Sequence, residues 1–371
     1  MRFSRLLFST AVCVVLGLLA GCAAIPTTTT LTASDPVMPT PATAICGIAS
    51  NAPSDTAIQV YFTDPQTSGI SKRSAVLEDE VLSDLCQARQ SIKVAMYSFT
   101  LENMADGLIA AQRRGVNVQM VMESDNMNTT AVQKLVKAGI PVVGDTSDGL
   151  MHDKFIIVDD QVVWTGSFNA TDNSLETDNN NFVRIESNPI AQDYAAEFDE
   201  MYVSREFGPD SPNETDGTAF TLNNMPVKVY FAPEDRVAKH FSDLVGGAQH
   251  SIQFLAYSFT SDSLADTLLT RMNNGVVVQG VFDEDESTSA GAEYDHLRRA
   301  GLDVRLDGNP GLMHEKVIIL DGETIVFGSY NFTKAADQSN DENLVVIEDP
   351  GLAQQFQTEF ERVYQQAQPQ S

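Results

Sequence analysis

Basic side chains are scarce in this sequence. Its 371 residues carry 23 Lys and Arg against 51 Asp and Glu, a formal net charge of −28. Proteins that bind nucleic acid without sequence preference depend on Lys and Arg contacts to phosphate, so this balance argues against that class, although a local basic groove remains compatible with it. Apolar residues make up 43% of the chain, which is enough for two folded cores.

Cysteine is also rare, with four residues in the chain. The sequence has no Cys-x-x-Cys pair and no Cys/His cluster, so it predicts no zinc site. Cys13 and Cys22 lie in or directly after an apolar leader. Cys46 and Cys86 remain, either as one disulfide in an oxidising compartment or as two unrelated thiols.

A long apolar run occurs only near the N-terminus, from Leu6 to Leu19, after two Arg residues. The run is too short for a stable membrane span, and it ends in Leu-Ala-Gly-Cys22, which resembles the cleavage box of bacterial lipoproteins. The resemblance implies a signal peptide over residues 1–21 and an acylated Cys22. The chain would then be lipid-anchored in a bacterial cell envelope, at the outer membrane or the periplasmic face. An ordinary secretory signal or a transmembrane anchor are the alternatives.

Composition and an internal repeat divide the rest of the chain. Residues 22–57 are rich in Thr, Pro, Ser and Ala and predict a flexible tether. The segment Ile92 to Thr100 returns as Ile252 to Thr260, and both end in Tyr-Ser-Phe-Thr. A polar stretch separates the two copies. These features predict an N-terminal domain, a linker and a C-terminal domain over residues 58–203, 204–224 and 225–371.

Each copy of the repeat alternates strands with helices, which predicts an α/β sandwich. The copies open with strands at Ile58 to Phe62 and Val227 to Phe231. They close with helices at Ile190 to Val203 and Leu352 to Gln366. The sequence therefore predicts two similar α/β domains.

Histidine is scarce too, and two of the five His residues occupy equivalent places in the repeat. LMHDKFIIVDDQVVWTGSFN begins at Leu150 and LMHEKVIILDGETIVFGSYN begins at Leu312, so both contain HxKxxxxD followed by GSxN. Residues two apart on a strand share a face, so the His and the Lys of each copy leave the strand together. The turn that follows predicts a hairpin, which returns GSxN to the His end.

This pattern assembles the groups needed to hold and attack a phosphate. Two His at equivalent points beside a Lys favour catalysis over two structural histidines. The Lys residues suit a phosphate clamp better than strand-edge gatekeepers. Ser and Asn after Gly would alone be turn residues, but their repetition favours phosphate contacts. The predicted site residues are His152, Lys154, His314 and Lys316, with Ser167, Asn169, Ser329 and Asn331 at the phosphate.

The duplicated motif resembles that of the phospholipase D superfamily of phosphodiesterases. The resemblance implies a pseudo-dimer with one shared active site, in which one His attacks phosphorus and the other protonates the leaving alkoxide. It also places Asp159 and Asp321 among the catalytic residues, although Asp between a strand and a turn is commonly structural. No cofactor or metal is expected, because two Lys can neutralise the phosphoryl oxygens.

The two copies differ at the position where family members commonly carry an acid that orients the His. This residue is Glu342 in the second copy and Asn180 in the first. The carboxylate should pair with the His of its own copy, His314, and make it the better acid, which leaves His152 as the neutral nucleophile. Asp178 or Glu176 could replace the carboxylate that the first copy lacks.

Tyr97 and Tyr257 recur at the same place in both copies, and core packing is the favoured interpretation for them. The resemblance implies a phospholipase D-like enzyme that hydrolyses phospholipid head groups or transfers them to an alcohol. A superfamily nuclease, a cardiolipin synthase-like phosphatidyl transferase and a non-catalytic binding module are the alternatives. The expected partners are phospholipid and, through Cys22, a membrane; nucleic acid is not expected, and the expected state is a monomer.

Overall fold

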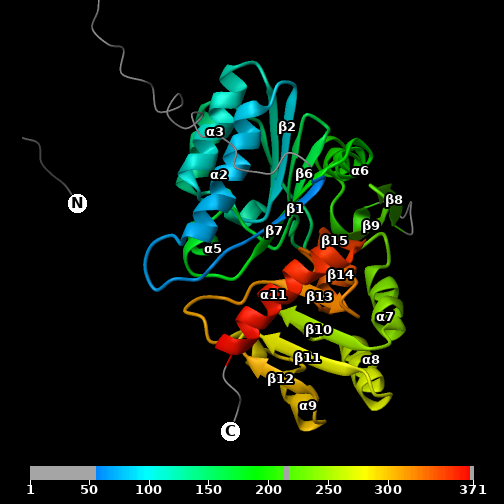
Figure 1. Ribbon diagram of the computed structural model, residues 1–371. Coiled ribbons are helices and arrows are strands. Elements are labelled where there is room, and N and C mark those ends of the chain that lie inside the picture. The colour runs from blue at the N-terminus through cyan, green and yellow to red at the C-terminus, as the bar shows by residue number, and fades with distance from the viewer. Residues whose placement is uncertain (1–55, 212–216, 368–371) are drawn as a thin grey trace, which may run out of the picture. The chain divides into compact units, whose positions relative to one another are not determined.

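The computed structural model describes residues 56–211 and 217–367 (Figure 1). The predicted signal peptide, the predicted lipidation site Cys22 and Cys46 lie outside the described residues, as does almost all of the predicted tether. Cys86 is disulfide-bonded, and its partner also lies outside them. Among the described residues, no helix has the length and apolar character needed to cross a membrane.

The N-terminal half contains a seven-stranded sheet in the order β1-β7-β6-β5-β2-β3-β4. Strands β2, β3 and β4 run parallel, and the other neighbours run antiparallel. The central strand β5 is buried throughout, as its continuous apolar sequence predicts. The strands are β1 (Ile58–Phe62), β2 (Ser91–Met96), β3 (Asn117–Met122), β4 (Val142–Gly144), β5 (Lys154–Val158), β6 (Val162–Gly166) and β7 (Asn181–Glu186).

The C-terminal half repeats this order and adds one strand at the edge, β12-β11-β10-β13-β14-β15-β9-β8. The added strand β8 pairs antiparallel with β9 and lies within the predicted linker 204–224, so part of that segment is regular structure. The strands are β8 (Thr218–Leu222), β9 (Met225–Ala232), β10 (Ser251–Ala256), β11 (Val277–Phe282), β12 (Asp303–Leu306), β13 (Lys316–Leu320), β14 (Thr324–Gly328) and β15 (Glu342–Glu348).

Helices follow the strands at equivalent places in both halves (Figure 1). The N-terminal half has α2 (Lys72–Gln87), α3 (Glu102–Arg113), α4 (Thr130–Lys137), α5 (Asp172–Glu176) and α6 (Asn188–Asp199), with short turns η1 (Ser124–Asn126), η2 (Glu200–Ser204) and η3 (Gly208–Asp210). The C-terminal half has α7 (Val237–Gly247), α8 (Asp262–Asn273), α9 (Tyr294–Arg299), α10 (Lys334–Gln338) and α11 (Pro350–Gln366), with the turn η4 (Glu286–Thr288). The closing helix predicted to reach Val203 ends at Asp199 and continues as the π-helical turn η2.

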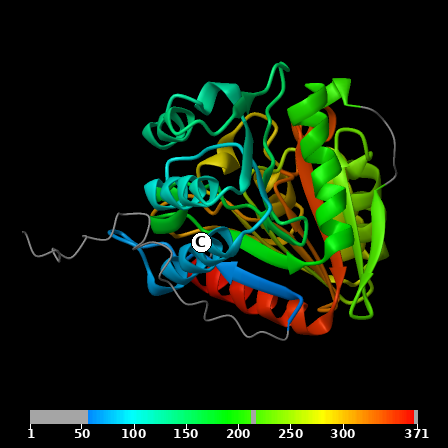
Figure 2. The ribbon, with the colours of Figure 1, turned by 90° about the horizontal axis from the view of Figure 1, so that it is seen from above.

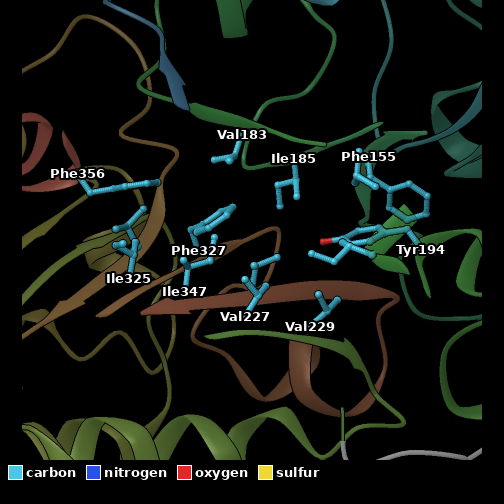
Figure 3. Close-up of a cluster of buried hydrophobic side chains, with 14 of the residues drawn as sticks. Phe155, Val183, Ile185, Tyr194, Val227, Val229, Ile325, Phe327, Ile347 and Phe356 are labelled. Carbon is cyan, nitrogen blue, oxygen red and sulfur yellow. The ribbon is translucent and has the colours of Figure 1, made fainter. Parts of the chain in front are cut away.

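Each half has its own apolar core beneath its outer helices, and a third core is built from both halves. In this shared core, Phe155 and Tyr194 of the first half lie with Val229 and Phe327 of the second (Figure 3). The C-terminal helix α11 lies alongside β1 of the other half (Figure 2). Burial of apolar surface is the main force that holds the halves together. The two predicted α/β domains are thus confirmed.

Candidate active site

Both His-Lys motifs lie at the start of a central strand, and each is hydrogen-bonded to the other half of the molecule. The N–H of His152 donates to the carbonyl oxygen of Asp341 at 3.0 Å. The N–H of His314 donates to the carbonyl oxygen of Asn179 at 3.0 Å. Short parallel bridges, Met151 with Asp341 and Asn179 with Met313, complete this exchange. The segment that carries each His is therefore held against the residue that directly precedes Glu342 or Asn180 in the other half.

As a result, the side chain of each motif histidine pairs with a residue of the other half. Nδ1 of His152 lies 2.8 Å from Oε2 of Glu342, and Nδ1 of His314 lies 3.0 Å from Oδ1 of Asn180. The prediction that each partner serves the His of its own copy is wrong, because the bridges place residue 342 beside residue 152 and residue 180 beside residue 314. Since Nδ1 of each ring is occupied, Nε2 is the nitrogen left for chemistry. The glutamate thus faces His152, and the amide faces His314.

Burial controls the charge of both motif histidines. Both side chains are almost fully buried. Desolvation lowers the pKa of His152 well below its ordinary value, and the ammonium groups of Lys154 and Lys316 act in the same direction. The pKa of His314 is also lowered well below its ordinary value by burial and the same Lys residues, and a hydrogen bond to the backbone of Ser167 opposes this. A bound anionic phosphodiester would favour the imidazolium form again.

Lys154 and Lys316 are buried behind the histidines. Each Nζ donates to the carbonyl oxygen of the motif His two residues earlier, at 2.6 Å in both halves. Burial lowers the pKa of Lys154 to about 7, and it lowers the pKa of Lys316 well below its ordinary value. The ammonium of a buried Lys is costly without a counter-ion. The carboxylates of Glu342 and Asp153 oppose this lowering at Lys154. The phosphate clamp that the sequence predicts stays a prediction.

Tyr97 and Tyr257 belong to this site, and the interpretation of them as core residues is wrong. The Tyr97 ring meets the His152 ring edge-on at 4.9 Å between centroids, and the Tyr257 ring meets the His314 ring at 4.6 Å. The same rings lie 5.1 Å and 4.5 Å from Nζ of Lys154 and Lys316. Both tyrosines directly follow the strand, β2 or β10, that pairs with the motif strand. Their recurrence at the end of this strand in both copies was the signal that the sequence offered.

The serines of the GSxN segments hydrogen-bond the two residues that pair with the histidines. Oγ of Ser167 donates to Oδ1 of Asn180 at 3.0 Å, and Ser329 hydrogen-bonds Glu342. The Gly before each serine is required by close approach: at Gly166, with φ of 155°, a Cβ would collide with the carbonyl oxygen of Asn181. These serines thus orient Asn180 and Glu342, a role that the sequence did not predict.

A cavity of about 440 Å³ opens beside His314. Asn169 lies on its wall, and its buried Oδ1 makes no hydrogen bond within the described residues; the same holds for Oδ1 of Asn331 in the other half. Unused acceptors of this kind can receive the hydroxyl of a substrate or a water. The lining residues are Tyr97, Ser98, Thr100, Asn169, Thr171, Asp172, Asn173, Ser174, Asp178, Tyr257, Leu312 and His314.

Two segments of the chain, residues 81–202 and 242–364, match the family model described as cardiolipin synthase, phospholipase D-like domain. Each segment contains one HxK motif with its GSxN. The chain belongs to the phospholipase D superfamily. Two phospholipase D-like domains of this superfamily lie within one chain.

Its relatives within the superfamily each match about one third of this chain. A phospholipase D of Rickettsia conorii is 33% identical over 135 residues, 36% of this chain and 68% of its own length. The mitochondrial cardiolipin hydrolase of Chlamydomonas reinhardtii is 35% identical over 124 residues, 33% of this chain and 56% of its own length. The match thus spans little more than half of the second relative.

A solved structure shows the same two-domain arrangement. The phosphatidylserine synthase of Haemophilus influenzae Rd KW20 superposes with a TM-score of 0.63, covering 84% of this chain and 87% of that one. The two sequences are only 15% identical. This likeness establishes the fold.

The acidic residue inside each HxK motif was missed by the sequence reasoning. Asp153 accepts a 2.6 Å hydrogen bond from Nδ2 of Asn343, and Glu315 accepts one of 3.3 Å from Nδ2 of Asn181. Burial raises the pKa of Asp153 to about 7 and that of Glu315 to about 8. Both pairs join the two phospholipase D-like domains. An acid between His and Lys and an Asn at the start of strand β7 or β15 occur in both copies, and this repetition was the signal.

Asp159 and Asp321, which end the two HxKxxxxD motifs, lie at the ends of β5 and β13 that are far from the histidines. Asp159 accepts hydrogen bonds from the backbone N–H groups of Arg89, Gln90 and Ser91, at 2.7 to 3.1 Å. Asp321 accepts the same set from residues 249–251. Burial alone would raise the pKa of Asp321, but these donors lower it. Both residues therefore tie the motif hairpin to the turn before β2 or β10, and the structure does not bring them to the histidines.

We expect Asp159→Asn and Asp321→Asn each to lower the free energy of unfolding by about 1–2 kcal/mol, because a charged acceptor of several backbone donors becomes neutral. Asn tolerates the left-handed backbone found at both positions, with φ of 53° and 54°. Urea unfolding checks the loss, with Asp160→Asn as the matched control. The kcat/KM should stay within about twofold of wild type; a hundredfold loss of kcat/KM at unchanged stability would make these residues catalytic.

Proposed function

We propose that the protein cleaves the head groups of phospholipids through a phosphohistidine on residue 152. The observation that carries this proposal is the unequal pairing of the histidines, Glu342 on His152 and Asn180 on His314. A nucleophilic imidazole gains a positive charge when it bonds to phosphorus, and a buried carboxylate at Nδ1 stabilises that charge. A general acid must release a proton, and an amide at Nδ1 does not hold the proton as a carboxylate would.

In the first step, Nε2 of His152 bonds to phosphorus while the bond from phosphorus to the leaving oxygen breaks. Nε2–H of His314 gives its proton to that oxygen. In the second step, His314 takes a proton from water, the water oxygen bonds to phosphorus, and the bond to His152 breaks. Lys154 and Lys316 stabilise the charge on the phosphoryl oxygens throughout. An alcohol in place of water would give head-group transfer.

Phospholipid is favoured as the substrate by the charge of the chain and by the relatives. A net charge of −28 opposes the approach of a nucleic acid. The relatives include a phospholipase D and a cardiolipin hydrolase. The test is to incubate the purified protein with short-chain phospholipids and with single- and double-stranded DNA, and to measure head-group release and strand cleavage. Cleavage of DNA at rates above those for every lipid would overturn the proposal in favour of a nuclease.

We further propose that Cys22 is lipidated and holds the enzyme at a membrane of the bacterial envelope, where phospholipid is abundant. The support is the Leu-Ala-Gly-Cys sequence directly after the apolar run. Membrane fractionation of cells that express wild type and Cys22→Ser tests this. We expect wild type in the membrane fraction and the variant as soluble or uncleaved protein, whereas a cleaved variant that stays on the membrane would contradict the proposal.

A further inference from the structure

The two sides of the active site are equivalent in fold but opposite in charge. Helices α5 and α10 occupy the same place in the two halves, and each begins after a threonine whose Oγ1 caps the helix, Thr171 and Thr333. The first residue of α5 is Asp172, whereas the first residue of α10 is Lys334. Duplication alone would leave these positions alike. The first half thus carries a negative group at the position where the second half carries a positive one.

A second position in the same segments differs in the same sense. Asp178 lies at the end of the α5 loop, and the residue at this place in the second half is Asn340. Asp178 is 7% exposed and accepts hydrogen bonds at Oδ1 from the N–H of Leu312 and from Oγ1 of Thr177, both at 3.1 Å. Its Oδ2 makes no hydrogen bond within the part of the chain that the structure describes. One carboxylate oxygen is thus available to another group.

Both acids lie on the wall of the cavity beside His314. Asp172 is exposed, and its Oδ2 accepts a hydrogen bond of 2.9 Å from Oγ1 of Thr100. The remaining wall is made of hydroxyl and amide side chains, the rings of Tyr97, Tyr257 and His314, and Leu312. No Lys or Arg is among the described lining residues. Carboxylates and tyrosine rings are the surfaces that attract a substituted or primary ammonium group. An anionic group would be repelled there.

We propose that this cavity holds the leaving alcohol of the diester and that Asp172 and Asp178 select alcohols with a positively charged ammonium group. The inference rests on the proposed function, because it needs His314 to be the acid that protonates the leaving oxygen. The group next to the acid is then the leaving alcohol. Diesters of choline and ethanolamine fit the cavity, and those whose leaving alcohol is uncharged or anionic fit it less well.

The test compares soluble short-chain phosphatidylcholine with phosphatidylglycerol, both below their micelle concentrations, so that the charge of a lipid surface plays no part. The quantity is the ratio of their kcat/KM values. We expect this ratio to fall about tenfold or more in the double variant Asp172→Asn with Asp178→Asn, since each lost carboxylate weakens an electrostatic contact. Asn at 178 retains an acceptor for Leu312, which protects the fold. Asp172→Lys, which copies position 334, should lower the ratio by itself.

The control variant is Asp243→Asn, because Asp243 is exposed on α7 and pairs only with Lys239 among the described residues. Its ratio should equal that of wild type. The wild-type preference for phosphatidylcholine should also weaken as salt is raised. If wild type cleaves both lipids but the ratio of their kcat/KM values is the same in the double variant and in Asp172→Lys, the selection by these acids is overturned. The proposed function would then still stand. Wild type that cleaves neither lipid would overturn the proposed function itself.

Discussion

His314→Ala is expected to lose alkyl head-group release almost completely and yet to form the covalent intermediate from an activated diester. An alkoxide leaving group needs the proton of His314, and loss of a positioned acid typically costs 10²–10⁴-fold. A p-nitrophenolate leaving group needs no proton, so bis(p-nitrophenyl) phosphate should give a burst of about one p-nitrophenolate per enzyme. Turnover should then stall, because the base that activates water is the same residue. Stopped-flow absorbance measures the burst.

His152→Ala is the matched variant, since the same side chain is removed at the equivalent place in the other half. It should show neither burst nor turnover with either substrate, because the atom that bonds to phosphorus is gone. Thermal unfolding of both variants controls for misfolding. A burst from His152→Ala and none from His314→Ala would reverse the roles.

Single substitutions at the two residues that pair with the histidines are expected to move opposite limbs of the pH–rate profile. In Asn180→Asp, a carboxylate beside His314 should raise the pKa of this acid, so that it stays protonated to higher pH. The alkaline limb should therefore move up by about one pH unit or more. In Glu342→Gln, the pKa of His152 should fall, so that the nucleophile stays neutral to lower pH and the acid limb moves down.

Glu342→Gln should also lower the plateau of kcat by about 10- to 100-fold, because the charge on the phosphohistidine loses its counter-ion. Glu176→Gln is the control, since Glu176 lies at the end of the nearby helix α5 and is not a partner of either His. A merely structural role for Glu342 would lower activity and stability at all pH values equally. An alkaline limb that moves in Glu342→Gln would place the acid at His152.

The sequence predicted the elements of the fold but not the contacts between the halves. Strand β1 and the motif hairpins lie where the apolar runs and turn signals place them, because these patterns are local. The partners of His152 and His314 were assigned within each copy, and the structure exchanges them. A repeat shows which positions are equivalent, but it does not show which copy faces which.

The same limit explains two other misplacements. Asp159 is near His152 in sequence terms but lies at the opposite end of the strand, since a five-residue strand extends by about 3.3 Å per residue. Tyr97 has the apolar ring of a core residue, and only the pairing of β2 with β5 brings it beside His152. Both cases depend on register and strand direction, which residue types alone do not determine.

We propose one active site that is shared by both halves, in which His152 is the nucleophile. The most direct measurement is mass spectrometry of the His314→Ala variant, quenched in alkali during the burst with bis(p-nitrophenyl) phosphate, because phosphohistidine survives alkali. We expect one aryl phosphoryl group per chain, on His152. A burst without an adduct on His152, or with the adduct on another residue, would contradict it.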